Sequence, residues 1–299
     1  MDLGRVVYNH RPGRCRTVRG PVHGSEGIEL IRSEGIAFVT SGLLYLQPER
    51  AHIPGKIFLY DFNQKLAEEH LTAVELPIKG DQFDQKNFHP HGLSHWVIGG
   101  VIRLYVINHD NEFKHSIMFF DFDPSGPALV HKKTLKHSSM VRAIEFLVGY
   151  KGGSVYFTDG TTYTALITSK AGPNGIAYDA ERNTLFVAII MAEVVEAYEL
   201  AKDKKSATLI SSIPVHSGCD NLFVGDDGSI YSGCHPVAHL VLRLKYSADY
   251  KTASITEPYS NNGSELSAST QAVVFGNQML IGSVCRTLLH CEISDLSVL

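Results

Sequence analysis

Short runs of β-branched and aromatic residues recur along the whole chain, and segments with the apolar spacing of a helix are almost absent. Glycine, proline, asparagine and aspartate separate these runs, as is typical of strands joined by turns. The pattern therefore predicts an all-β fold. The clearest predicted strands are residues 35–39, 56–60, 103–107, 116–120, 154–157, 184–188, 229–232 and 278–282.

The predicted strands form a coarse repeat. A turn leads into an apolar strand, and a second turn and strand follow, with starts near Gly35, Gly92, Ile144, Gly175, Asn221 and Ala272. The intervals are about 57, 52, 31, 46 and 51 residues, close to one four-stranded propeller blade each. Six starts predict a six-bladed β-propeller, as a single domain over residues 1–299. The interval after Ile144 is about 20 residues short, so we expect one abbreviated blade there.

Composition narrows the class of protein. A length of 299 residues with 44% apolar residues allows one sizeable core. The net charge is −4 and the basic residues are dispersed, which argues against nucleic acid as a partner. The most apolar stretch, residues 96–107, contains Arg103 and is shorter than the roughly 20 residues of a membrane helix. Residues 1–5 lack the apolar core of a secretory signal, so the protein is either cytosolic or its leader is missing from this sequence.

Four turn-like segments beside predicted strands carry oxygen-bearing side chains that could converge on one ion. Carboxylate and amide oxygens, without a Cys/His cluster, favour calcium over zinc. In a propeller the loops that start successive blades surround the central channel, which would let residues far apart in sequence meet. The candidate calcium ligands are Glu26, Asp159, Asn174, Asp220 and Asn221.

Two histidines are candidates for a general base. Opening an ester or lactone needs a group that deprotonates water, and imidazole titrates near neutral pH. His91, with His109 behind it, could form such a pair, and His235 could line the same cavity. The other interpretation is a satisfied core histidine, which is the more common case for a histidine in an apolar strand.

The five cysteines form no CxxC pair, which argues against a structural zinc site. Cys219, Cys234 and Cys285 are predicted to be small buried thiols rather than nucleophiles. Asn262 begins an Asn-Gly-Ser sequon, which predicts glycosylation if the chain passes through the secretory pathway.

Several motifs resemble the paraoxonase family of calcium-dependent lactonases and arylesterases. They are FHPHGLS at 88–94, VINH at 106–109, NGI at 174–176, CDN at 219–221, GCHP at 233–236 and LIGSV at 280–284. The resemblance extends in one order over about residues 15–293. It implies a propeller closed by a Cys15–Cys291 disulfide, a catalytic calcium on the five candidate ligands, and a histidine dyad of His91 and His109.

The same resemblance implies the activity and the setting. The expected substrates are lactones, aryl esters and organophosphate triesters, and a lipid or lipoprotein surface is a further expected partner. The expected location is extracellular or in the lumen of the secretory pathway.

The sequence departs from the family at three places. Asp159 stands where the family has Asn, which should tighten ion binding but weaken the metal as a Lewis acid. The carboxylates that hold a second, structural calcium in the family fall on Gly27 and Gly160, which predicts a one-calcium protein. Family members also carry about 40 more residues between the positions of Asp159 and Asn174, including a helix that walls the active site.

These departures leave two alternatives to an active enzyme. The first is a non-catalytic propeller that binds a partner or assists the assembly of a membrane protein, which the missing wall favours. The second is a truncated or alternatively spliced form of an active parent. The retained Glu26, Asn174, Asp220 and Asn221 favour the enzyme.

Overall fold

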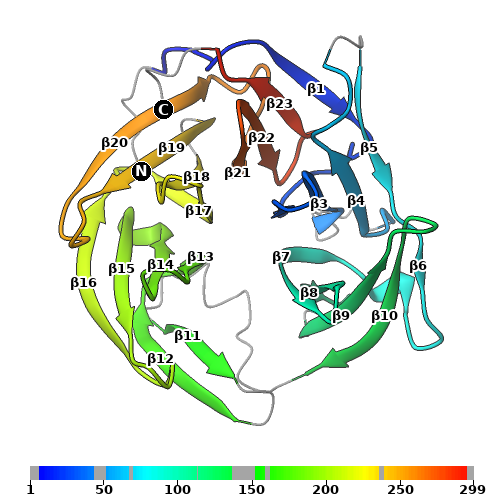
Figure 1. Ribbon diagram of the computed structural model, residues 1–299, viewed down its shortest axis with the longest axis horizontal. Helices are drawn as coiled ribbons and strands as arrows, with labels where there is room; N and C mark the ends of the chain where they lie inside the picture. The colour runs from blue at the N-terminus through cyan, green and yellow to red at the C-terminus, as the bar shows by residue number, and fades with distance from the viewer. Residues whose placement is uncertain are drawn as a thin grey trace. The chain divides into compact units, whose positions relative to one another are not determined.

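The structure is a computed structural model that describes residues 7–43, 52–66, 70–112, 114–136, 152–158, 162–235 and 239–294. Strands dominate these residues, beside two single-turn 3₁₀ helices, η3 (Gln85–Asn87) and η4 (Ile190–Ala192). All the clearest predicted strands fall in or overlap observed strands, so the all-β prediction is confirmed (Figure 1). In this part of the chain no helix has the length and apolar character needed to cross a membrane.

Packing divides the chain into two compact units. The first unit comprises Gly13–Arg142 and Val273–Ser294, and the second comprises Met1–Pro12, Ala143–Ala272 and Asp295–Leu299. The single domain over residues 1–299 stays a prediction.

A mixed sheet has the order β2-β3-β4-β5-β1-β23-β22-β21, and all of it except residues 269–272 of β21 belongs to the first unit. The N-terminal strand β1 joins its two halves, because it pairs in parallel with β5 and antiparallel with β23. The strands are β1 (Cys15–Arg19), β2 (Ile28–Ile31), β3 (Ile36–Ser41), β4 (Lys56–Asp61), β5 (Leu71–Glu75), β21 (Ser269–Phe275), β22 (Gln278–Ser283) and β23 (Leu289–Glu292).

A second sheet of the first unit has the order β6-β10-β9-β8-β7. Alternate residues of β9 are buried, as expected for a strand with one face on a core. Phe122 of β9 packs edge-on against Phe38 of β3 at 5.1 Å, so this core joins the two sheets of the unit. The strands are β6 (Ile78–Lys79), β7 (Pro90–Ile98), β8 (Val101–His109), β9 (His115–Asp123) and β10 (Ala128–Leu135).

The second unit contains two four-stranded antiparallel sheets, β13 to β16 and β17 to β20, and a two-stranded sheet of β11 and β12. Phe186, Ala188 and Leu244 are fully buried in the core between the larger sheets. The strands are β11 (Gly153–Thr158), β12 (Tyr163–Lys170), β13 (Pro173–Asp179), β14 (Thr184–Ile189), β15 (Val194–Leu200), β16 (Ala207–Pro214), β17 (Gly218–Val224), β18 (Ile230–His235), β19 (His239–Tyr246) and β20 (Ala253–Asn261).

The predicted blade starts agree with the sheets at four positions. Gly92, Gly175, Asn221 and Ala272 lie in β7, β13, β17 and β21, the strands at one end of each sheet. The predicted blade start at Gly35 is one strand too late. Gly35 forms the turn between β2 and β3 with a φ of 64°, and β2 is the strand at the end of the sheet. Ile144 lies outside the described residues. Among the described residues, the two-stranded sheet of β11 and β12 is the abbreviated blade.

Two disulfides cross-link neighbouring strands. Cys15 of β1 and Cys291 of β23 are opposite each other in the ladder and are bonded, as the resemblance implied. Cys219 of β17 and Cys234 of β18 are also bonded, so the prediction of two buried thiols was wrong. The reason is the antiparallel pairing, which places their Cα atoms 4.1 Å apart. Cys285 belongs to neither disulfide.

The buried histidine of β23 should make folding sensitive to acid. Burial, followed by the charge of Arg16, lowers the pKa of His290 to about 4, so the unfolded chain takes up this proton more readily. The contribution of His290 to stability should therefore be full above pH 6.5 and fall as the pH drops, by about 2 kcal/mol for this residue alone between pH 7 and pH 5. Urea unfolding at the two pH values measures the loss. In a His290→Gln variant, which keeps an amide opposite Gln278, the loss should shrink by this amount, and an unchanged loss would contradict the assignment.

Candidate functional site

A buried carboxylate and two histidines form a connected group in the first unit. Glu26 precedes β2 and is 1% exposed. Its Oε1 lies 3.1 Å from Nε2 of His91, and Nδ1 of His91 lies 2.8 Å from Nε2 of His109. The structure thus brings together the predicted ligand Glu26 and both members of the predicted dyad.

A third histidine, His115, extends this group and was not predicted. Its Nδ1 lies 2.5 Å from Nδ1 of His109. The two residues are opposite each other in the antiparallel ladder of β8 and β9, where β8 ends at His109 and β9 begins at His115. Aligning the two strands with each other would have found the pair, because the last residue of β8 faces the first residue of β9.

His109 is held in its neutral form. Burial, reinforced by the neighbouring imidazoles of His91, His115 and His89, lowers the pKa of His109 to about 3. A neutral imidazole has one N–H and one lone pair, so His109 can accept a proton from one neighbour while donating its own to another.

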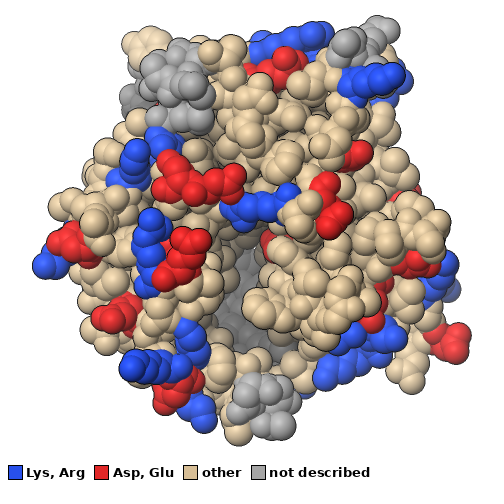
Figure 2. Space-filling model, in the orientation of Figure 1, with Lys and Arg blue, Asp and Glu red and all other residues tan. Residues whose placement is uncertain are grey.

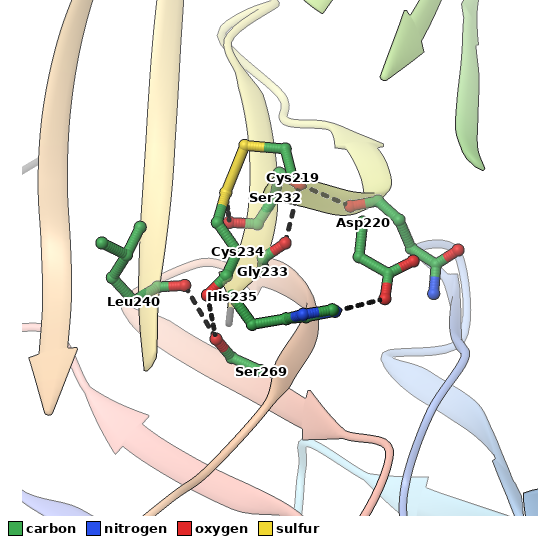
Figure 3. The surroundings of a disulfide bond; sticks show 9 residues. Cys219, Asp220, Ser232, Gly233, Cys234, His235, Leu240 and Ser269 are labelled. Atoms are coloured by element: carbon green, nitrogen blue, oxygen red, sulfur yellow. Dashed lines mark hydrogen bonds and ion pairs between the residues drawn. A yellow bond between two sulfur atoms is a disulfide. The ribbon is translucent and has the colours of Figure 1, made fainter. Parts of the chain in front are cut away.

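Three further predicted ligands, Asn174, Asp220 and Asn221, lie in the second unit. The backbone of β13 at Gly175 packs directly on β17, since a Cβ on Gly175 would lie 2.0 Å from the carbonyl oxygen of Asp220. This contact places Asn174 beside the pair Asp220 and Asn221. Oδ2 of Asp220 lies 3.0 Å from Nε2 of His235, and Figure 3 shows these two side chains pointing toward each other next to the Cys219–Cys234 disulfide.

Strand irregularities occur at the predicted site residues of three sheets. The pairing register shifts between Pro90 and Leu93 in β7, between Pro173 and Ile176 in β13, and between Cys219 and Leu222 in β17. In a regular strand the side chains of consecutive residues point to opposite faces of the sheet, so they cannot both bind the same ion. A bulge relaxes this alternation, which makes it possible for Asp220 and Asn221 to act together.

The position of Gly27 has no room for a carboxylate. A Cβ there would lie 2.8 Å from Cδ2 of Leu93 and 3.0 Å from Oγ1 of Thr40. The Thr40 hydroxyl accepts a hydrogen bond from the Gly27 N–H at 2.9 Å and donates to the His91 carbonyl at 2.8 Å. A neutral threonine and a leucine therefore fill this place. Gly160 lies outside the described residues.

The donor chemistry of the predicted set fits calcium. Glu26 and Asp220 supply buried carboxylates, and Asn174 and Asn221 supply amide oxygens, which are hard ligands. Among the described residues no three His, Cys, Asp or Glu side chains gather as a metal site. Asp159 lies outside the described residues.

The sequon at Asn262 follows β20 directly. Asn262 and Ser264 are exposed, and the backbone N–H of Asn262 donates to Oδ1 of Asn9 at 2.9 Å. The side chain is therefore reachable from solvent, while its glycosylation stays a prediction.

Charges of both signs are interspersed on the face shown in Figure 2. Basic side chains in the described part of the chain pair locally with acids, among them Arg103 with Asp121 at 2.7 Å and Lys170 with Glu196 at 2.8 Å. Such local pairing leaves little uncompensated positive charge for a polyanion to contact.

Comparison with curated proteins finds relatives over nearly the whole chain. Mechanosensory abnormality protein 6 of Caenorhabditis elegans is 28% identical over 344 aligned positions, covering 98% of this chain and 90% of the relative. Serum paraoxonase/arylesterase 1 of Homo sapiens is 28% identical over 322 positions, covering 93% of this chain and 88% of the relative.

Solved structures with the same fold have low sequence identity. A luciferin-regenerating enzyme matches with a TM-score of 0.57 at 9% identity, covering 94% of this chain and 95% of that one. The calcium-binding protein regucalcin of Agrobacterium tumefaciens matches with a TM-score of 0.54 at 13% identity, covering 96% of each chain. Likeness at this identity shows the fold alone, which is a six-bladed β-propeller.

The sequence profile described as arylesterase matches residues 7–142 and 138–293. The two matches together take in every predicted site residue and both disulfides. A serum paraoxonase aligns with 93% of this chain over 88% of its own length, in agreement with the profile match. The chain belongs to the arylesterase family, which includes the paraoxonases.

Proposed function

We propose that the protein is a calcium-dependent hydrolase of lactones and aryl esters, with organophosphate triesters as further substrates. The observation that carries the proposal is the hydrogen-bonded series of Glu26, His91 and His109, with separations of 3.1 and 2.8 Å. A histidine placed between a carboxylate and a neutral imidazole is suited to take up a proton and to pass it on. Membership of the arylesterase family supports the reaction class.

His91 is the candidate general base of this series. Its side chain is 31% exposed while that of Glu26 is 2% exposed, so solvent reaches the histidine but not the carboxylate. His91 would accept the proton of the attacking water at Nε2, the nitrogen that faces Glu26, so its Nδ1 carries hydrogen and donates to Nε2 of His109, which holds the ring in place. His235, which contacts Asp220, is the candidate for contact with the substrate in the second unit.

The metal ligands proposed are Glu26, Asp159, Asn174, Asp220 and Asn221, all of which offer oxygen. When bound, calcium polarises a carbonyl and stabilises the negative charge that develops on its oxygen. We propose one ion per chain, because Leu93 and Thr40 fill the place that a second-site carboxylate would take at Gly27.

The proposal is tested on the purified full chain with small lactones and phenyl acetate, before and after treatment with a chelator. Hydrolysis should disappear with the chelator and return with added calcium. A His91→Gln variant should lose hydrolysis while retaining calcium, which separates the base from the ligands. Bound calcium without hydrolysis of any substrate would reject the enzyme and leave the alternative below.

The alternative is a non-catalytic propeller that binds a partner or assists the assembly of a membrane protein. The two-stranded sheet of β11 and β12 favours this alternative. A short blade offers fewer residues to enclose a substrate near the candidate ligand Asp159. The 344 aligned positions with mechanosensory abnormality protein 6 exceed the 299 residues of this chain, so that relative has residues that this chain lacks. Its name describes mechanosensation rather than hydrolysis.

We also propose that the protein resides outside the cell or in the lumen of the secretory pathway. Disulfides persist in oxidising compartments and are rare in the cytosol, and this chain has two. Glycosylation at Asn262 and contact with a lipid or lipoprotein surface belong to the same setting.

The short blade predicts a preference for small substrates. A wall that packs on the apolar part of a long-chain lactone would lower its KM, and such a wall is expected to be missing here. KM should therefore rise with the length of the alkyl chain, and kcat/KM should be greatest for small lactones and activated aryl esters. A lactone series of increasing chain length measures the trend. Preference for the longest members would mean that another segment forms the wall.

A further inference from the structure

Three histidines lie on neighbouring strands of one sheet in the first unit. His91 is near the start of β7, His109 ends β8 and His115 begins β9. His109 and His115 are cross-strand partners in the ladder. The proposed hydrolysis uses His91 and His109, and it assigns nothing to His115.

The contacts make a continuous row of imidazoles. Nδ1 of His115 lies 2.5 Å from Nδ1 of His109, and the two rings meet edge to face with centroids 4.6 Å apart. On the other side, Nε2 of His109 lies 2.8 Å from Nδ1 of His91. Both ring nitrogens of His109 therefore contact a nitrogen of another imidazole.

The two contacts of His109 are linked through its single proton. Burial lowers the pKa of His109 to about 3, so the ring is neutral near neutral pH and has one N–H. If Nδ1 carries the hydrogen, His109 donates to His115 and accepts from His91. If Nε2 carries it, both directions reverse. The partner at Nδ1 thus acts together with Glu26, whose carboxylate faces Nε2 of His91 at 3.1 Å, in determining what His109 offers to His91.

We infer that His115 is a positioning residue for the proposed hydrolysis: through its Nδ1 it holds His109 in one tautomer and one ring orientation, and so sets the direction of the hydrogen bond to His91. The inference rests on the proposed function for its catalytic consequence, but not for the tautomer itself. His115 would play the part of the third group that orients a catalytic base in a hydrogen-bonded triad.

Loss of His115 should disturb His109 in a specific way. Nδ1 of His109 would lose its partner in a largely buried place, where an unmade hydrogen bond is costly. The ring could then exchange its proton between the two nitrogens or rotate away from His91. A misplaced base would lower kcat while leaving substrate binding unchanged.

Two substitutions separate hydrogen bonding from packing. His115→Asn removes the ring but keeps polar atoms near the position of Nδ1, and His115→Phe keeps a ring that can pack edge to face but offers no nitrogen. His131→Leu is the control for losing another histidine of the same sheet, since His131 in β10 contacts Thr134 rather than the row. Circular dichroism and thermal unfolding check that each full-length variant folds.

The primary readout is the ¹⁵N chemical shift pair of the His109 ring in histidine-labelled protein near neutral pH. We expect one tautomer in the wild type, in His115→Asn and in His131→Leu, and averaged or mixed shifts in His115→Phe. With a small lactone, kcat of His115→Phe should fall about tenfold or more with an unchanged KM, while His115→Asn stays near the wild type.

Unchanged His109 shifts in His115→Phe would overturn the inference. Equal disturbance in both His115 variants would also overturn it, because the ring itself rather than its nitrogen would then be responsible. A wild-type protein without hydrolysis would reject the proposed function, and the chemical shifts would still decide whether His115 sets the tautomer of His109.

Discussion

Replacing Asp220 with alanine is expected to remove the bound calcium and to lower kcat/KM for lactones by about 100-fold or more. Asp220 is 6% exposed and is one of the proposed carboxylate ligands. Alanine removes that oxygen and also the acceptor that faces Nε2 of His235 at 3.0 Å. Metal analysis after exhaustive desalting measures the ion, and lactone kinetics measure the activity.

Two further variants make this test specific. Asp220→Asn keeps an oxygen in the same place and should retain part of the calcium affinity. Asp203→Ala removes an exposed carboxylate from the hairpin tip between β15 and β16, and should change neither calcium content nor kinetics. Full calcium occupancy in Asp220→Ala would show that Asp220 is not a ligand.

Removing the Cys15–Cys291 disulfide is expected to lower the free energy of unfolding by about 3 to 5 kcal/mol. The two cysteines are separated by 276 positions, so the bond restricts nearly the whole unfolded chain. Paired Cys15→Ala and Cys291→Ala substitutions, followed by urea unfolding, measure the effect. Since β1 connects the two halves of the mixed sheet, the same variant should also unfold less cooperatively.

The second disulfide provides an internal comparison. Cys219 and Cys234 are separated by only 15 positions, so replacing both with alanine should cost less, about 3 kcal/mol, in the same chain-entropy account. Reductant should bring the wild type below either double variant. Equal unfolding midpoints for the wild type and the Cys15/Cys291 variant would contradict the role given to the closing bond.

The strands could be predicted because their signals are local. Each clear strand is a run of apolar residues bounded by turn formers, and the short interval before Gly175 marks the abbreviated blade. Gly35 shows the limit of this reasoning, since a glycine that turns between β2 and β3 resembles one that starts a blade.

The contacts within the site depend on strand register, which no motif shows and which has to be worked out by aligning neighbouring strands. His115 pairs with His109 only because the β8–β9 ladder aligns them, and Cys219 meets Cys234 through the β17–β18 ladder. The residue types and the resemblance to a family both pointed to Glu26, His91 and His109, but neither pointed to His115, which belongs to no motif used for that resemblance. The Cys219–Cys234 pair lies beside a shift of register, so alternation along the two strands does not predict it.

The bulges in β7, β13 and β17 have a consequence for variation among relatives. Where a strand contains one more residue than its partner needs, the geometry of the site is encoded in the number of residues as well as in their identity. A substitution at Gly92 or Asn221 changes one side chain, but a deletion there would restore regular pairing and make the side chains of the neighbouring site residues alternate between the two faces of the sheet. In an alignment of relatives, single-residue deletions at these positions should therefore indicate loss of the proposed hydrolysis more reliably than substitutions do.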